Sequence, residues 1–333
     1  MVFSSIEFLF YFLPVTLVAY FAADRFGPPK LRNIVLLVAS LLFYTWSSGA
    51  LVLLLVVSTV VDYALGWGVA SANAQGHLAR KRLYVTVSVL VNLSMLGYFK
   101  YANFLVDSLN DVGDWLGVGT IAWTSVALPV GISFFTFQSM SYTIDVSRGR
   151  CEHLRNPVDF ALYVALFPQL IAGPIVRYHE ISEELLVRST RLDDFAQGSI
   201  RFLHGLAKKV IVADAVAEIA DAAFASDTGD LTTTAAWVGI AAYTVQIYFD
   251  FSGYSDMAIG LGRIFGFHFP ENFRRPYSAL SITDFWRRWH ITLCNWFRDY
   301  VYIPLGGSRG TSAAMYRYLV TVFLLTGIWH GAN

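Results

Sequence analysis

The sequence predicts an all-α, polytopic membrane protein: a helical bundle with broken and re-entrant helices around a central cavity. Of its 333 residues, 56% are apolar and 14% are charged, whereas soluble domains carry about 45–50% apolar and 25% charged residues. Apolar runs near the ~20 residues needed to cross a bilayer recur along the chain. Proline and glycine interrupt several of these runs, which predicts the breaks.

The predicted spans follow the apolar runs. They occupy residues 6–23, 31–46, 50–70, 83–99, 120–144, 160–176, 231–249 and 318 onward. The second run is short, so a re-entrant helix is an alternative for it. The first run is not a cleavable signal peptide, because its basic residues Arg25, Lys30 and Arg32 follow the apolar stretch instead of preceding it.

The charges of the loops predict the orientation. Basic residues mark the cytoplasmic ends of spans, and they gather at 25–32, 80–82 and 148–155, whereas the loop at 107–114 is acidic. This alternation places the N-terminus and the acidic loop outside. Residues 202–224 carry three acids on one helical face, which favours an interfacial helix over a span there.

Three apolar runs contain a predicted break, at 128–131, at 167–174 and at 251–253. Non-helical backbone at membrane depth persists only where it is buried in protein or lines a wet cavity, because lipid offers its polar groups no partners. Three breaks together favour a protein-lined cavity. Proline kinks in ordinary helices are the alternative for any one of them.

Charge and cysteine content exclude several classes of protein. The 24 acidic residues balance the 24 basic ones, so no global charge attracts nucleic acid. Cys151 and Cys294 lie far apart and form no CxxC pair, so we expect neither a disulfide framework nor a metal site.

An arginine cluster is the first candidate site. Arg274, Arg275, Arg287 and Arg288 fall within fifteen residues, interleaved with tryptophans. Arginine pairs bidentately with phosphate, so the cluster predicts a pocket for a phosphorylated ligand, and anionic lipid would attract it as well. An aromatic belt with snorkelling arginines would explain the same residues without chemistry.

His330 is the second candidate. It ends the uncharged stretch 318–329, and an ionisable residue at membrane depth is a functional hypothesis by default. Desolvation disfavours the imidazolium form, so the ring would be neutral and able to accept a proton. A hydrogen-bonded packing histidine is the alternative.

Other polar residues have weaker cases. His290 lies in a charged segment that suits the membrane interface. Asp250 and Asp256 flank the break at 251–253, where they would orient a histidine, bind a cation or satisfy exposed backbone. The remaining histidines are expected to be solvated or structural: His77, His153, His179, His204 and His268.

Five blocks of sequence carry a resemblance to a known family. They are residues 248–258 (YFDFSGYSDMA), 272–277 (NFRRPY), 284–291 (DFWRRWHI), 302–307 (YIPLGG) and 329–333 (WHGAN). In this order they resemble the membrane-bound O-acyltransferase family. Residues 1–5 and 167–175 further resemble its bacterial alginate O-acetyltransferase branch, whose members continue for several helices past position 333.

The resemblance implies a function and a site. It implies a single domain over 1–333, with N-terminal spans at 1–176, interfacial helices and loops at 177–230 and a catalytic region at 231–333. The family's characteristic histidine maps onto His330 and its second motif histidine onto His290. The implied reaction moves acetyl from a cytoplasmic donor such as acetyl-CoA, with no bound cofactor, to hydroxyls of an exopolysaccharide outside the bacterial inner membrane. A periplasmic acetyltransferase partner is also implied.

A transporter or flippase for a polyanionic lipid or glycan is the rival from another class. It would use the same arginines and the same cavity, but it would need no catalytic base.

Overall fold

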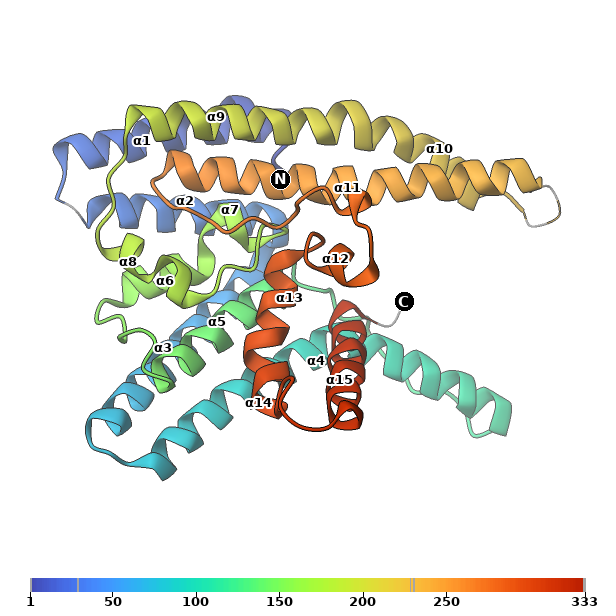
Figure 1. The fold of residues 1–333 in the computed structure, drawn as a ribbon, viewed down its shortest axis with the longest axis horizontal. Coiled ribbons are helices and arrows are strands. Elements are labelled where there is room, and N and C mark those ends of the chain that lie inside the picture. Colours follow the sequence, from blue (N-terminus) through green and yellow to red (C-terminus); the bar gives the residue numbers. More distant parts are fainter. Residues whose placement is uncertain (1, 29, 228, 230, 332–333) are drawn as a thin grey trace. The chain divides into compact units, whose positions relative to one another are not determined.

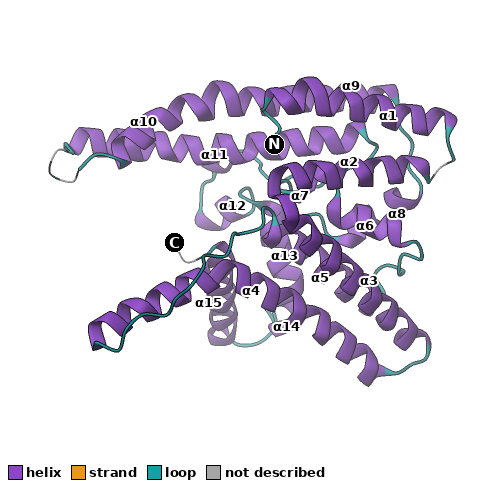
Figure 2. Cartoon of the chain, turned by 180° about the vertical axis from the view of Figure 1, so that it is seen from behind, coloured by secondary structure: helices purple, strands orange, loops and turns teal. Residues whose placement is uncertain are grey.

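The computed structural model describes residues 2–28, 30–227, 229 and 231–331, and it contains helices and loops but no strand in those ranges (Figures 1 and 2). The chain forms two compact units that interleave along the sequence. The first unit comprises residues 1–46, 166–176 and 180–292, and the second comprises residues 47–165, 177–179 and 293–333. The all-α prediction is confirmed.

The first unit is built around a pair of long helices. It contains α1 (Leu13–Phe26), α2 (Leu31–Ser48), α7 (Phe167–Leu170), α8 (Tyr178–Leu186), α9 (Leu192–Ala207), α10 (Asp214–Phe224), α11 (Thr233–Ile264) and α12 (Ile282–Trp286). A π-helical segment, Lys208–Ala213, joins α9 to α10, and both views show these helices lying along α11 (Figures 1 and 2).

Glycines set the spacing between α9 and α11. A Cβ on Gly205 would lie 2.5 Å from the carbonyl oxygen of Gly253, and one on Gly198 would lie 2.7 Å from that of Gly260. Small residues of this kind let helix backbones approach closely. The predicted break at 251–253 is therefore wrong: α11 continues through it, and Gly253 packs against α9 instead of interrupting the helix.

The second unit contains α3 (Val52–Ala74), α4 (Leu78–Leu116), α5 (Ile132–Ser147), α6 (Pro157–Ala165), α13 (Ile291–Phe297), α14 (Ile303–Leu305) and α15 (Ser312–His330). A buried polar cluster joins its first three helices. Asp62 of α3 accepts hydrogen bonds from Ser88 (2.7 Å) and Asn92 (2.9 Å) of α4, and Ser88 contacts Thr143 of α5 at 3.0 Å. Hydrogen bonds of this kind help helices to associate in lipid. An apolar side chain gains little there by leaving lipid to contact another helix, because both surroundings are apolar.

Four helical segments in the described residues are long and apolar enough to cross a membrane: Phe8–Phe26, Leu31–Ala74, Leu78–Leu116 and Ser312–His330. They contain most of the predicted runs 6–23, 31–46, 50–70, 83–99 and 318 onward. Of the predicted run 231–249, residues 233–249 lie within α11, which is helical but is not among these four segments.

Residues 120–144 do not form one span. Residues 119–129 have no regular secondary structure, Val130 and Gly131 form a turn in which Gly131 adopts φ 75°, and α5 begins only at Ile132. Asn103 of α4 replaces the missing helix hydrogen bonds, since its side chain bonds both the N–H and the carbonyl of Val126 at 2.9 Å. The predicted break at 128–131 is confirmed.

Residues 160–176 are likewise discontinuous. The helix α6 ends at Ala165, α7 covers four residues, and the chain then runs on as a loop. The predicted break at 167–174 is confirmed, and a continuous span there is wrong.

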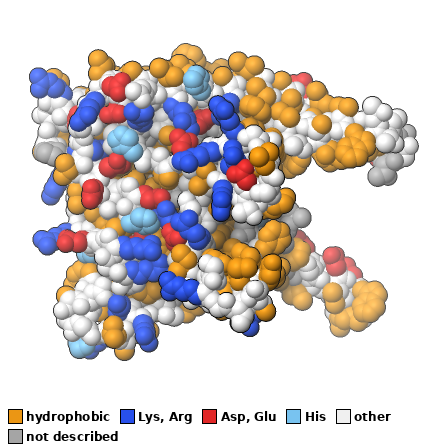
Figure 3. All heavy atoms as spheres, in the orientation of Figure 1, with side chains coloured by type: hydrophobic (Ala, Val, Ile, Leu, Met, Phe, Trp, Pro, Cys, Tyr) orange, Lys and Arg blue, Asp and Glu red, His pale blue; other side chains and the backbone are white. Residues whose placement is uncertain are grey.

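The segment 202–224 is helical throughout, because the end of α9, the π-helical segment and α10 follow one another without interruption. Asp214, Glu218 and Asp221 are exposed, whereas Ala213 and Ala220 are buried on the opposite side. Figure 3 shows hydrophobic side chains scattered along the arm that α10 and α11 form. The predicted amphipathic face is present, and its location at a membrane interface stays a prediction.

Candidate active site

His290 and the arginine cluster belong to the first unit, and His330 belongs to the second. The last two residues of the motif at 329–333 lie outside the described residues.

Asn272 is the centre of a buried polar network in the first unit. Its side chain is fully buried, and its Oδ1 accepts hydrogen bonds from the Thr292 hydroxyl (2.9 Å) and backbone N–H (3.3 Å). Its Nδ2 donates to the Ser255 hydroxyl of α11 at 3.0 Å. The Asn272 carbonyl accepts from the N–H of Ile291 at 2.9 Å. The network therefore ties the loop after α11 to residues 291 and 292, the last two residues of the same unit.

This network fixes the proton of His290. The backbone N–H of Thr292 can only donate, so the Asn272 atom that faces it is an acceptor. His290 Nδ1 lies 3.1 Å from the same Oδ1, so Nδ1 carries the proton. In the neutral ring Nε2 is then the basic nitrogen.

The surroundings of His290 differ from the predicted interfacial ones. The residue is only 3% exposed, and its ring meets the edge of Phe251 at 4.8 Å. A charged sequence surrounds His290, but the backbone turns its ring inward through a left-handed conformation with φ 42°. Arg275 (φ 49°) is the other non-glycine residue with positive φ among the described ones. Backbone strain of this kind clusters at functional sites.

The structure brings part of the arginine cluster together. The Arg274 N–H donates to the carbonyl of Arg288 at 2.9 Å, so the two arginine pairs are joined through the backbone. Arg288 is half-exposed and pairs with Asp284 at 2.8 Å. Among the described residues, no carboxylate lies within 4.0 Å of Arg274, Arg275 or Arg287, which are all exposed. These three guanidinium groups keep their full capacity for an anionic ligand.

The electrostatics of the cluster agree with this picture. The hydrogen bond from Arg288 holds the pKa of the Asp284 carboxyl below its usual range, and the charge of Arg287 acts in the same direction. Two tryptophans of this segment lie in different surroundings, and only one of them suits an aromatic belt at the membrane interface. Trp289 packs inward against Phe273 at 5.1 Å, whereas Trp286 is 45% exposed, as an aromatic belt requires.

His330 is the last residue of α15, and its side chain is exposed. The neighbouring Trp329 is buried, with its ring 5.4 Å from that of Phe137 and 4.8 Å from that of His330. The helix end therefore presents the imidazole while the tryptophan anchors it.

A charge that the sequence analysis missed lies beside His330. Lys100 of α4 donates to the carbonyl of Trp329 and lies 3.3 Å from the Ser133 hydroxyl. The sequence does carry a signal for it, since Lys100 directly follows the apolar run 83–99, just as Asp62 stands alone inside the run 50–70. Neither residue has an oppositely charged residue close by in the sequence with which an ion pair could be predicted.

Asp250 and Asp256 form ion pairs instead of flanking a break. Asp256 contacts Arg201 at 2.6 Å and also contacts Lys208, and Asp250 contacts Lys209 at 2.7 Å. Figure 3 shows charged side chains of both signs mixed over this face. Because the helix is continuous there, these acids satisfy no exposed backbone.

His179, predicted to be solvated or structural, is held by a buried acid. Its Nδ1 lies 2.7 Å from Asp145, which also accepts from the Tyr300 hydroxyl at 2.8 Å. Asp145 is fully buried, so this contact is a structural anchor of the second unit.

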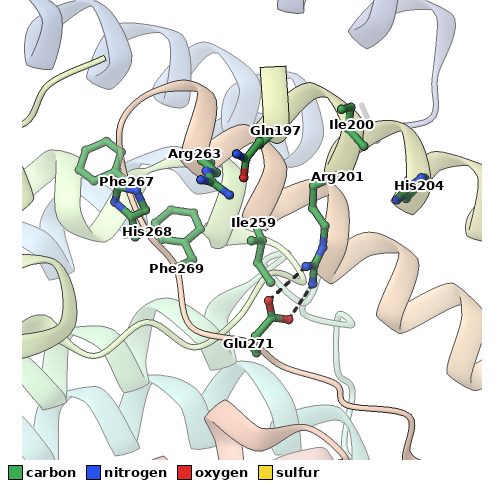
Figure 4. Close-up of a pocket in the computed structure, with 10 residues that line it drawn as sticks. All are labelled: Gln197, Ile200, Arg201, His204, Ile259, Arg263, Phe267, His268, Phe269 and Glu271. Carbon is green, nitrogen blue, oxygen red and sulfur yellow. Dashed lines mark hydrogen bonds and ion pairs between the residues drawn. The ribbon is translucent and has the colours of Figure 1, made fainter. Parts of the chain in front are cut away.

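A pocket of about 370 Å³ lies in the first unit (Figure 4). It is lined by Gln197, Ile200, Arg201, His204, Ile259, Arg263, Phe267, His268, Phe269 and Glu271. Glu271 reaches toward Arg201, and the two form a bidentate pair at 2.6 and 3.1 Å (Figure 4). None of the predicted site residues and none of the broken runs contributes to it. The central cavity at the breaks stays a prediction.

The comparison with protein families is decisive for the class. A sequence model described as the membrane-bound O-acyltransferase family matches residues 36–333. The chain belongs to this family. With the four apolar helical segments, membership makes it a multi-pass membrane protein.

Individual family members with high similarity come from bacteria. The chain is 51% identical over its full length to a protein of Azotobacter vinelandii named "Probable alginate O-acetylase AlgI", and 49% identical to the protein of that name from Pseudomonas aeruginosa. It is also 37% identical to the peptidoglycan O-acetyltransferase of Helicobacter pylori, of which it covers 67%. The predicted resemblance to the alginate O-acetyltransferase branch of the family is confirmed. The chain spans less than two thirds of the two alginate relatives, 65% and 62% of their length.

Proposed function

We propose that this chain carries the reaction centre of an O-acyltransferase that moves acetyl from a cytoplasmic donor to hydroxyls of a polysaccharide outside the bacterial inner membrane. The observation that carries the proposal is an exposed histidine on an anchored helix end, His330, in a chain of this family. We propose acetyl-CoA as donor, alginate or a related glycan as acceptor and a periplasmic acetyltransferase as partner. The names of the relatives support two parts of this proposal: the transferred group is acetyl, and the acceptor is a glycan.

The chemistry needs a base. A sugar hydroxyl attacks the thioester carbon as His330 removes its proton, an oxygen–carbon bond forms, and the carbon–sulfur bond breaks. The thiolate leaves and takes a proton from solvent. General-base catalysis of this kind contributes typically 10²- to 10⁴-fold. His290, with its proton held on Nδ1, offers a second basic nitrogen, and we assign it a role secondary to that of His330.

The length of α4 supports an outward-facing acceptor site. Arg82 and Lys100 lie on this helix, 18 residues apart, which is about 27 Å along its axis. The hydrocarbon core of a bilayer is about 30 Å thick. If the basic residues 80–82 face the cytoplasm, Lys100 and the adjoining end of α15 lie toward the opposite face, where the glycan is.

Cysteine labelling tests this orientation. We expect Gln75→Cys to react with a membrane-impermeant maleimide only from the cytoplasmic side and Asp111→Cys only from the periplasmic side, in a protein whose Cys151 and Cys294 are replaced by serine. Both positions are exposed, and Gln75 avoids the left-handed backbone of the adjacent Gly76 (φ 69°). Labelling of Gln75→Cys from the periplasm in intact cells contradicts the orientation.

The donor site is assigned to the arginine cluster. Replacing Arg287 with glutamine is expected to raise the KM for acetyl-CoA by about 10- to 100-fold, because a hydrogen bond to a charged group contributes about 1.5–3 kcal/mol. Arg287 is the better choice, since Arg288→Gln also breaks the pair with Asp284. Arg309→Gln, at another exposed arginine, is the control. An unchanged KM with poor membrane insertion favours the aromatic belt.

Transfer of radiolabelled acetyl from acetyl-CoA into glycan, by the purified protein with its periplasmic partner in vesicles, tests the function itself. We expect label in the glycan and free thiol on the donor side. Movement of glycan or lipid across the vesicle membrane without any label transfer would establish the rival, a transporter or flippase.

A further inference from the structure

Lys100 occupies an unusual position in the second unit. Its ammonium lies 5.4 Å from the ring centroid of Trp329, donates to the Trp329 carbonyl and contacts the Ser133 hydroxyl at 3.3 Å. Among the described residues, no carboxylate lies within 4.0 Å of it. A partly buried charge is usually paired. The partner of this ammonium is the Trp329 carbonyl, at the end of a helix.

That helix end carries His330. The last carbonyls of an α-helix lack intrahelical donors and hold partial negative charge. On α15, Lys100 satisfies the carbonyl of Trp329, and the hydroxyl of the adjacent Tyr101 satisfies that of Ile328. Gly331 then leaves the helix with φ 125°, and a Cβ there would lie 3.1 Å from Lys100 Cε. The turn that bears the imidazole is therefore fastened to α4.

We infer that Lys100 is the positioning residue of His330. This inference rests on the proposed function, because it assigns Lys100 a part in the same reaction. His330 stands in the last turn of α15, and the last turn of a helix frays readily. A catalytic base displaced by about 1 Å loses as much as 10²-fold in rate. The ammonium prevents that displacement by holding the backbone one residue away.

The chain offers a matched control. Lys81 donates to the carbonyl of Ser147, the last residue of α5, at 3.1 Å. This contact is chemically the same as that of Lys100, a lysine on α4 that satisfies the end of another helix. Lys100 differs in also contacting the Ser133 hydroxyl and the Trp329 ring, and the helix end that Lys81 holds carries no predicted site residue.

The first test compares Lys100→Met with Lys81→Met. Lys100→Met is expected to lower kcat for acetyl transfer by roughly 10- to 100-fold, with the KM for acetyl-CoA within twofold of the parent, while Lys81→Met leaves both unchanged. Lys100→Arg, which keeps the charge and the donors, restores most of kcat. An unaltered kcat in Lys100→Met overturns the inference.

A double-mutant cycle separates positioning from general structural damage. If Lys100 acts through His330, Lys100→Met has no further effect on the residual rate of a His330→Ala protein. An equal loss in both backgrounds shows that Lys100 acts elsewhere, and the inference fails.

Hydrogen exchange gives a readout that needs no activity. In Lys100→Met the amides of residues 327–331 are expected to exchange at least tenfold faster than in the parent, and in Lys81→Met they are not. Unchanged exchange overturns the anchoring. Faster exchange in a protein whose parent transfers no acetyl leaves the anchoring intact and refutes the proposed function, so the two failures are distinguishable.

Discussion

Replacing His330 with alanine is expected to lower glycan acetylation by two orders of magnitude or more while the protein inserts and accumulates normally. A positioned base contributes typically 10²- to 10⁴-fold, and the chemical step loses that factor with the ring. The fold loses little, because the exposed ring forfeits at most a hydrogen bond or two, about 1–3 kcal/mol. Affinity for the donor should be nearly unchanged, and acetyl transfer and membrane accumulation are measured on the same preparation.

The control for this experiment is His204→Ala, at an exposed histidine of α9 in the first unit. It should leave the rate unaffected, and His290→Ala should cost less rate than His330→Ala if the role of His290 is secondary. Near-normal acetylation by a well-accumulated His330→Ala protein removes this histidine from the mechanism and favours the transporter.

The Asn272→Ala variant is expected to lose more stability than any other proposed here. The substitution leaves the buried N–H groups of Thr292 and His290 without their acceptor, at about 1–3 kcal/mol for each unsatisfied group. At about 2–4 °C per kcal/mol, the thermal midpoint in detergent should fall by roughly 4–24 °C. The proton on Nδ1 of His290 also loses the acceptor that holds it there, so the catalytic rate should fall as well.

Asn73→Ala serves as the comparison for Asn272→Ala. Asn73 also uses its amide in a hydrogen bond, to the carbonyl of Val146 at 3.0 Å, but the residue is exposed. Its loss should shift the midpoint by no more than about 2–4 °C, because water replaces the partner. Equal shifts for the two variants would mean that the Asn272 network contributes no special stability.

The sequence predicts the helical class and most of the spans, because the length and composition of an apolar run decide both. It fails over 120–127, which continue the predicted span, because Asn103, a residue of the preceding helix, pairs with the backbone of Val126 outside any helix. No local pattern reveals a hydrogen bond to another element. It fails at Gly253 for a related reason, since only the approach of Gly205 shows that this glycine packs and does not break the helix.

The sequence predicts which residues form the candidate site, but it does not predict what surrounds each of them in the structure. His290 and the arginines stand out by type and spacing, but the inward turn of His290 depends on Asn272, eighteen residues earlier. Lys100 meets Trp329 across 229 positions of sequence. The contact that anchors a candidate base thus depends on how α4 and α15 fold against each other, which single-sequence patterns do not encode.

The glycine contacts between α9 and α11 have a consequence for how this pair of helices is held. Where a glycine of one helix faces a backbone carbonyl of the other, its Cα hydrogens lie against that oxygen, the arrangement in which Cα–H···O bonds form, at about 0.5–1 kcal/mol each. Such bonds join the two main chains, and they strengthen as the surroundings become less polar. Replacing one of these glycines with alanine would therefore remove an attraction between the two backbones as well as add a steric clash.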